Sequence, residues 1–150
     1  MTLQEAQNAF ENLKTEATTK SEMKVYEKFL HILKALKDRT LAENEMHAIE
    51  TELANLNIKS NPKNKKRFFN KALSKFEKYL KENFSLITKG YYTNLSVSFG
   101  LLFGVVGGVL LGQHFEKSLG ISFGICMGLF IGAFIGRRKD AQAQAAGNIL

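Results

Sequence analysis

The sequence predicts an all-α protein: a cytoplasmic helical bundle or hairpin, followed by a two-span transmembrane helical hairpin with GxxxG ladders. Three observations predict it. Residues 1–89 are rich in Lys, Glu and Asn, whereas residues 91–136 contain only Glu116 and Lys117 as charges. Two uncharged runs there are 22 and 19 residues long, roughly 30 Å each as helices and enough to cross a hydrocarbon core. Glycines recur every fourth residue in both runs.

Residues 1–58 form the first part of the soluble region, in which we expect three helices. Apolar residues recur there at steps of three and four, the spacing of one apolar face per helix. The three faces comprise Leu3, Ala6, Phe10, Leu13 and Ala17; Val25, Phe29, Ile32 and Leu36; and Ala42, Met46, Ile49, Leu53 and Leu56. Thr19 with Glu22 and Thr40 with Glu43 have capping-box spacing, so we expect the second and third helices to begin after these threonines.

Residues 59–89 are expected to form a basic amphipathic juxtamembrane helix that starts at Asn61–Pro62 and ends near Ile87. The segment carries ten Lys or Arg against two Glu. Its apolar stripe is Phe69, Leu73, Phe76, Leu80 and Phe84, and its basic side holds Lys63, Arg67, Lys71, Lys75 and Lys78. The phenylalanines either enter the headgroup region beside anionic lipid or form the fourth wall of the bundle. We expect no nucleic-acid partner, because the bias of positive charge toward the cytoplasmic side already explains the basic run.

The two spans are predicted at residues 91–112 and 119–136, joined by a short external turn at 113–118. The small residues of the two ladders, which we expect to pack helices together, are Ser96, Gly100, Gly104, Gly108 and Gly112, and Gly120, Gly124, Gly128, Gly132 and Gly136. Every fourth residue stays on one side of a helix, so each ladder is a groove that permits close backbone approach. The ladders pair either within one hairpin or between neighbouring subunits, and the sequence leaves both arrangements open.

Charge and aromatic placement predict that both termini are cytoplasmic. The basic helix precedes the first span, and Arg137, Arg138 and Lys139 follow the second, at the start of a basic tail over residues 137–150, of which we expect residues 141–150 to be mobile. Tyr91 and Tyr92 mark the membrane boundary, as in an aromatic belt. The polar N-terminal sequence lacks the basic-then-apolar order of a secretory signal.

The residue inventory predicts no enzyme, no cofactor and no metal site. His31, His47 and His114 share no metal-ligand spacing. The single cysteine, Cys126, lies in the middle of the second span and has no partner for an intramolecular disulfide. The glycine ladders match neither the dinucleotide-binding nor the P-loop pattern.

The chain resembles the uncharacterised small bacterial glycine-zipper membrane proteins. The resemblance rests on the two ladders, on residues 89–94 (KGYYTN) before the first span and on residues 136–140 (GRRKD) after the second. It covers residues 88–147 and extends more loosely into the soluble half. It implies a location in the bacterial inner membrane and brings no activity, cofactor or functional residue.

These patterns indicate a non-enzymatic membrane protein that acts in membrane assembly or as a scaffold. Its expected partners are the lipid bilayer, including anionic lipid, further copies of the chain in a homo-oligomer, and a cytoplasmic protein bound by residues 1–89. The alternative is an oligomeric pore, channel or membrane-lesion-forming protein. The absence of an ionisable residue within either span speaks against a conducting path.

Overall fold

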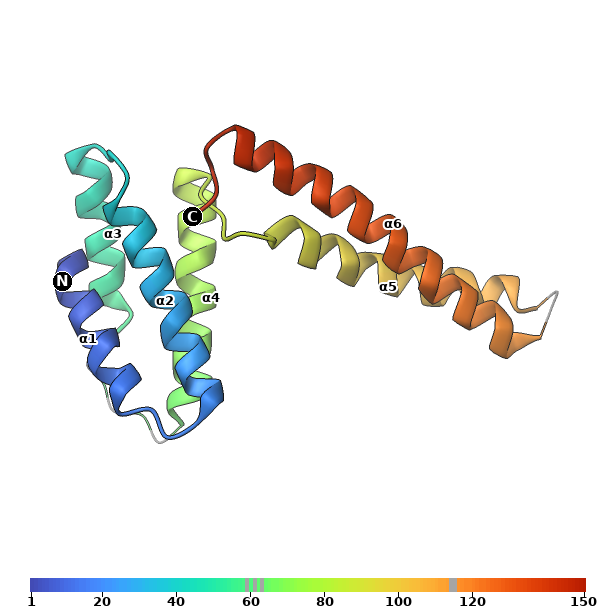
Figure 1. The fold of residues 1–150 in the computed structure, drawn as a ribbon, viewed down its shortest axis with the longest axis horizontal. Coiled ribbons are helices and arrows are strands. Elements are labelled where there is room, and N and C mark those ends of the chain that lie inside the picture. Colours follow the sequence, from blue (N-terminus) through green and yellow to red (C-terminus); the bar gives the residue numbers. More distant parts are fainter. Residues whose placement is uncertain (59, 61, 63, 114–115) are drawn as a thin grey trace. The chain divides into compact units, whose positions relative to one another are not determined.

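The computed structural model covers the whole chain and describes residues 1–58, 60, 62, 64–113 and 116–150. In these residues the regular secondary structure consists of six α-helices (Figure 1), which confirms the predicted all-α class. The helices belong to two units, Met1–Ile87 together with Leu150, and Thr88–Ile149. The expected membrane-surface residue Lys63 lies outside the described part of the chain.

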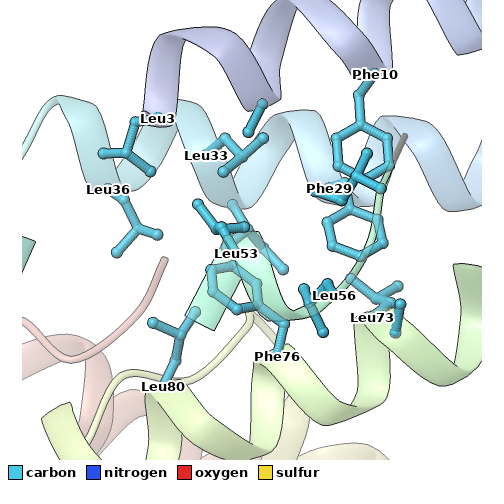
Figure 2. Packing of buried hydrophobic residues seen from close by; sticks show 14 of the residues in the cluster. Leu3, Phe10, Phe29, Leu33, Leu36, Leu53, Leu56, Leu73, Phe76 and Leu80 are labelled. Atoms are coloured by element: carbon cyan, nitrogen blue, oxygen red, sulfur yellow. The ribbon is translucent and has the colours of Figure 1, made fainter. Parts of the chain in front are cut away.

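The N-terminal unit packs four helices around one hydrophobic core. They are α1 (Leu3–Thr15), α2 (Lys20–Lys37), α3 (Glu43–Asn55) and α4 (Lys65–Phe84). Helix α2 contacts α1 and α4, and α3 also contacts both α1 and α4. Figure 2 shows the core, in which the rings of Phe10 and Phe29 stack with centroids 4.2 Å apart. The ring of Phe76 of α4 lies near that of Phe29, with centroids 6.3 Å apart, so α4 completes the core.

The starts of α2 and α3 show which capping predictions hold. The hydroxyl of Thr19 accepts a hydrogen bond from the backbone N–H of Glu22 at 3.3 Å, which confirms the predicted start of α2. The predicted cap at Thr40 is wrong. Instead, the carboxylate of Glu45 accepts from the backbone N–H of Ala42 at 3.1 Å, and the helix starts directly after that alanine.

Helix α4 begins later than predicted. Asn61 lies outside the described residues, and Pro62 precedes the helix. The cap is Asn64, whose side-chain oxygen accepts a hydrogen bond from the backbone N–H of Arg67 at 3.0 Å. Both asparagines are good N-cap residues, so residue type alone could not separate them.

The same helix also ends earlier than the predicted Ile87. Ser85 adopts a left-handed conformation with φ of 56°, which stops α4 at Phe84. The backbone N–H of Leu86 then donates to the carbonyl of Leu80 at 3.2 Å. Leu86 and Ile87 are buried, so the chain turns back toward apolar surroundings instead of continuing the helix.

The second unit is an antiparallel pair of helices, α5 (Tyr91–Leu111) and α6 (Lys117–Ala145), which lie side by side (Figure 1). Both are long and apolar enough to cross a membrane. Helix α5 ends one residue before the predicted end at Gly112, which serves as its C-cap, and α6 starts two residues before the predicted 119. Residues 114–115 of the predicted turn lie outside the described part of the chain.

The prediction that residues 141–150 are mobile is wrong for their first half, which is helical. Helix α6 continues through the basic residues to Ala145, because they and the alanines and glutamines after them are good helix formers. It stops just before Gly147, whose φ of 72° is left-handed, as is common at helix ends. Leu150 is buried in the N-terminal unit, and its N–H donates to the carbonyl of Ile87 at 2.9 Å.

Candidate functional site

The glycines of α5 and α6 face each other along the hairpin. A Cβ atom placed on Gly104 would lie 2.5 Å from the carbonyl oxygen of Gly124, and one placed on Gly108 would lie 2.7 Å from that of Gly120. A Cβ atom would also come closer than 3.0 Å to the opposite backbone at Gly100, Gly120, Gly124, Gly128, Gly132 and Gly136. The two backbones therefore touch wherever these glycines occur.

The first residue of the first ladder and the last of the second take part in the same contact. A Cβ on Gly132 would meet the carbonyl oxygen of Ser96, and one on Gly136 would meet the Cα atom of Thr93. The Cα atom of Gly112 lies 2.5 Å from the Cβ position of Gly120 at the other end. The ladder residues thus form one continuous seam between the two helices.

Gly107 differs from all of these glycines. A Cβ atom added to it would meet nothing within 4 Å. It precedes Gly108 and is turned away from the contact between the two backbones. Gly107 is thus a small residue on α5 that the packing of the hairpin does not require.

Large apolar side chains cover the outer faces of the two helices. Phe103 on α5 is 72% exposed and Phe130 on α6 is 79% exposed. In the most apolar 18-residue stretch of α5, only 11% is buried, and in the corresponding stretch of α6, only 28%. Such a continuous apolar surface is far larger than a soluble monomer normally exposes, and it matches the requirements of a helix surrounded by lipid.

A carboxylate from α6 caps the N-terminus of α5. Gly90, the N-cap residue, has no side chain to offer. Asp140 replaces it: one carboxylate oxygen accepts from the backbone N–H of Tyr92 at 3.0 Å, and the other accepts from the N–H and the hydroxyl of Thr93 at 3.0 and 2.6 Å. The negative charge also lies at the positive end of the helix dipole. The cap fixes the register of the two helices at this end.

Cations and aromatic rings surround the same end of the hairpin. The guanidinium of Arg138 lies 4.4 Å from the ring centroid of Phe134, and the ammonium of Lys139 lies 5.8 Å from that of Tyr92. The ring of Tyr91 meets that of Tyr92 edge to face at 5.3 Å. Rings and cations together are typical of a helix end at the headgroup level.

The basic side of α4 is exposed while its phenylalanine stripe is not. Phe69 and Phe76 are fully buried in the core of the N-terminal unit, so these rings cannot enter a headgroup region while the unit is folded. The interpretation of α4 as the fourth wall of the bundle is therefore correct for the stripe. The exposed cations of α4 predicted for the membrane surface are Arg67, Lys71, Lys75 and Lys78.

Two of these lysines form ion pairs. The ammonium of Lys75 lies 2.8 Å from the carboxylate of Glu52 on α3, and that of Lys78 lies 3.7 Å from Glu82 in the next turn of α4. The hydrogen bond from Lys75 lowers the pKa of Glu52, against the opposing effect of its burial. The Lys75–Glu52 pair therefore ties α4 to α3.

The described residues hold no group of three or more His, Cys, Asp or Glu side chains placed to bind a metal ion. Cys126 is exposed on the outer surface of α6. The seam itself consists of backbone and small side chains, an arrangement that packs helices.

No protein-family model, curated protein or solved structure matches this chain. The resemblance to bacterial glycine-zipper proteins thus rests on the sequence motifs named above.

Asp140 is the residue of this region whose role the sequence interpretation missed. A signal for it exists in the sequence. In an antiparallel hairpin, the end of the second helix lies beside the start of the first, and Asp140 is the only acid in residues 137–150. An acid at that place suits the uncapped N-terminus that Gly90 leaves.

Proposed function

We propose that this chain is a non-enzymatic integral membrane protein, in which the α5–α6 hairpin anchors the N-terminal unit as an interaction domain. The observation that carries the proposal is the exposed apolar surface of two helices that are long enough to cross a membrane. A soluble protein would have to cover that surface with other parts of the chain. In a bilayer, the same side chains meet acyl chains at no cost.

The anchor is proposed to be complete within one chain. The ladder glycines receive the opposite backbone of the same hairpin, and Asp140 caps α5 from within the same unit. Packing through small residues is the usual way in which helices associate in lipid. We therefore propose that the ladders stabilise the anchor, and that the N-terminal unit performs the assembly or scaffold role.

The proposed orientation places the N-terminal unit and the end of α6 in the cytoplasm of a bacterium, with the anchor in the inner membrane. The basic segment 59–89 and the cluster at Arg137, Arg138 and Lys139 flank the two spans on the same side, while the connection between the spans carries one Glu and one Lys. This distribution follows the positive-inside rule. The exposed lysines of α4 would add attraction to an anionic inner leaflet.

Topology mapping with single cysteines tests the proposal. The variant Cys126→Ser removes the only native cysteine. Single cysteines are then placed at Gln113, beside the turn, and at Ser21, in the N-terminal unit. We expect the protein to resist alkaline extraction from membranes. A membrane-impermeant maleimide should label residue 113 in intact spheroplasts, and residue 21 only after lysis.

Extraction of the protein by alkali would overturn the membrane assignment, and labelling of residue 21 in intact spheroplasts would overturn the orientation. Ion flux through liposomes containing the purified protein tests the alternative of a pore. An anchor leaves the liposomes sealed, whereas flux above that of empty liposomes would favour the pore.

A further inference from the structure

An apolar groove runs along one side of the seam between α5 and α6. The groove is lined by residues on one face of each helix, between Tyr92 and Leu111 on α5 and between Phe123 and Lys139 on α6. The volume is about 600 Å³, well within the range of about 300–1,000 Å³ that small-molecule sites occupy. The groove therefore extends along most of the apolar part of the hairpin.

The floor of the groove is made of glycine and its walls are large apolar side chains. Gly104 and Gly107 of α5 and Gly128 of α6 lie on the floor. Phe103 and Phe123, both largely exposed, are among the walls. Because a Cβ atom on Gly107 would meet nothing, the floor is open at this glycine and not filled by the hairpin itself.

The dimensions of the groove suit a hydrocarbon chain better than a second helix. From Tyr92 to Leu111 it extends roughly 28 Å, at about 1.5 Å per residue. A volume of about 600 Å³ distributed over that length makes the groove long and narrow.

One end of the groove is polar and positively charged. Lys139 and Tyr92 line it there, with the ammonium 5.8 Å from the ring centroid. The neighbouring negative charge, Asp140, is turned to the N-terminus of α5 and bound by its donors. The end of the groove therefore combines a cation with an aromatic ring at the level where a lipid phosphate lies.

We propose that this groove is a binding site for one anionic phospholipid, with an acyl chain along the glycine floor and the phosphate group beside Lys139. The inference rests on the proposed membrane anchor and goes beyond it, because it assigns one lipid class to one site. The charge of Lys139 selects an anionic headgroup. The length and thickness of the groove select a single acyl chain.

The test is lipid binding to the purified full-length protein by native mass spectrometry in a mild detergent. Dioleoylphosphatidylglycerol and dioleoylphosphatidylcholine are titrated separately. We expect the first to bind tighter. Lys139→Gln should weaken phosphatidylglycerol binding about fivefold, the effect of one basic residue near the headgroup, and leave phosphatidylcholine binding unchanged. The matched control is Arg137→Gln, which removes an exposed charge outside the groove and should leave both affinities unchanged.

A second variant tests the apolar part of the site. Gly107→Leu places a side chain on the open floor at a position where the added Cβ atom meets nothing within 4 Å, so the hairpin should keep its helicity. It should weaken the binding of both lipids about tenfold, since the acyl chain loses its apolar contact. Val106→Leu adds a methylene group at an exposed position outside the groove and serves as the control.

Three outcomes would overturn the site. Equal losses in Lys139→Gln and Arg137→Gln would mean diffuse attraction by the basic cluster. Unchanged binding in Gly107→Leu would mean that the groove is not used. A wild-type dimer that Gly107→Leu converts to monomer would mean that a second copy fills the groove. Each of these leaves the membrane anchor standing, whereas extraction by alkali would remove the anchor and the lipid site together.

Discussion

Thr93 and Asp140, 47 residues apart in the sequence, are joined by two hydrogen bonds to one carboxylate oxygen. The backbone N–H of Thr93 donates at 3.0 Å and its hydroxyl at 2.6 Å. The contact closes the hairpin at the end where the chain enters α5 and where α6 reaches its basic residues. A helix N-terminus normally finds its cap within its own first turn, so here the cap of one helix depends on the correct position of the other.

Replacing Asp140 by Asn should loosen this end of the hairpin. The amide keeps one acceptor but offers no second carboxylate oxygen and no negative charge for the donors at the start of α5. We expect a loss of about 1–2 kcal/mol in the free energy of unfolding, the range for a lost cap combined with a lost charge at a helix end. Unfolding of the purified protein in mixed micelles of dodecyl maltoside and SDS, followed by far-UV circular dichroism, measures it.

Thr93→Val is the second arm of this test, because it removes the hydroxyl and keeps the backbone donor. Thr93→Val should lower the free energy of unfolding by less than Asp140→Asn does, and the double variant should lower it by less than the sum of the two single losses. Arg137→Gln controls for a charge change in the same part of α6. Additive losses would contradict a direct Thr93–Asp140 interaction.

Gly104→Ala and Gly107→Ala should have opposite effects on the hairpin. The new methyl group at Gly104 would lie 2.5 Å from the carbonyl oxygen of Gly124, whereas the one at Gly107 would meet nothing within 4 Å. The contact atom is backbone, so the helices must move apart. We expect Gly104→Ala to lower the free energy of unfolding by about 1–3 kcal/mol. Gly107→Ala should leave it unchanged or raise it by up to about 1 kcal/mol, because alanine favours the helical conformation more than glycine does.

Both variants are measured by the same unfolding experiment, with the oligomeric state determined in parallel by light scattering. If Gly104→Ala dissociates an oligomer while the unfolding free energy of the hairpin stays at the wild-type value, the ladders act between chains. The interpretation of the seam as internal would then be wrong.

The seam shows what a sequence can and cannot predict. A repeat of four residues places Gly100, Gly104 and Gly108 on one side of a helix whatever packs there, so their suitability for close packing follows from spacing alone. Whether the partner is the other span or another subunit does not follow, since both ladders have the same period. Only the pairing of Gly104 with Gly124 in the folded hairpin distinguishes the two arrangements.

The ends of elements were predicted less well, for a physical reason. The apolar run of the second span ends at Gly136, but helix α6 continues to Ala145. Polar and charged residues can also favour a helix, so the end of an apolar run does not predict the end of the helix. The start of α4 was assigned to the wrong asparagine, because Asn61 and Asn64 are equally good caps in isolation. The role of Asp140 was missed because a cap from 47 residues away leaves no local pattern.

Lys75→Gln should destabilise the N-terminal unit in a pH-dependent manner. The ion pair lowers the pKa of Glu52 below its ordinary value of 4.5. A lowered pKa in the folded state contributes stability above the unfolded pKa, and this contribution is lost as the pH falls through the folded pKa. At pH 7 the free energy of unfolding of the wild type should therefore exceed that of Lys75→Gln by up to about 1 kcal/mol. The difference should vanish at a pH below the folded pKa of Glu52.

Urea unfolding followed by near-UV circular dichroism reports on this unit through its buried aromatic cluster. Lys71→Gln, at an exposed lysine one turn earlier on α4, controls for the change in net charge. A difference between wild type and Lys75→Gln that stays constant down to the lowest pH would mean that Lys75 acts through packing of its aliphatic chain and not through Glu52.

Tyr26→Phe should stabilise the N-terminal unit. The ring of Tyr26 is fully buried against Phe10 and Phe69, and among the described residues its hydroxyl has no hydrogen-bond partner. Burying an unpaired hydroxyl costs about 1–3 kcal/mol, and phenylalanine keeps the ring contacts, so we expect a gain of about 1 kcal/mol at pH 7. Tyr79→Phe is the control and should lose stability, because the hydroxyl of Tyr79 donates to the carbonyl of Ala48 at 3.4 Å.

The same variant should remove a loss of stability at high pH. Burial, and then the nearby carboxylates of Glu22 and Glu16, raise the pKa of Tyr26 above its ordinary value of 10.0. A raised folded pKa contributes stability that is complete below the unfolded pKa and is lost as the pH rises through the folded pKa. Urea unfolding between pH 8 and about pH 11, chosen to span the ordinary tyrosine pKa, should show a steeper decline for wild type than for Tyr26→Phe. Equal declines, or a loss of stability at pH 7, would mean that the hydroxyl has a partner such as a buried water molecule.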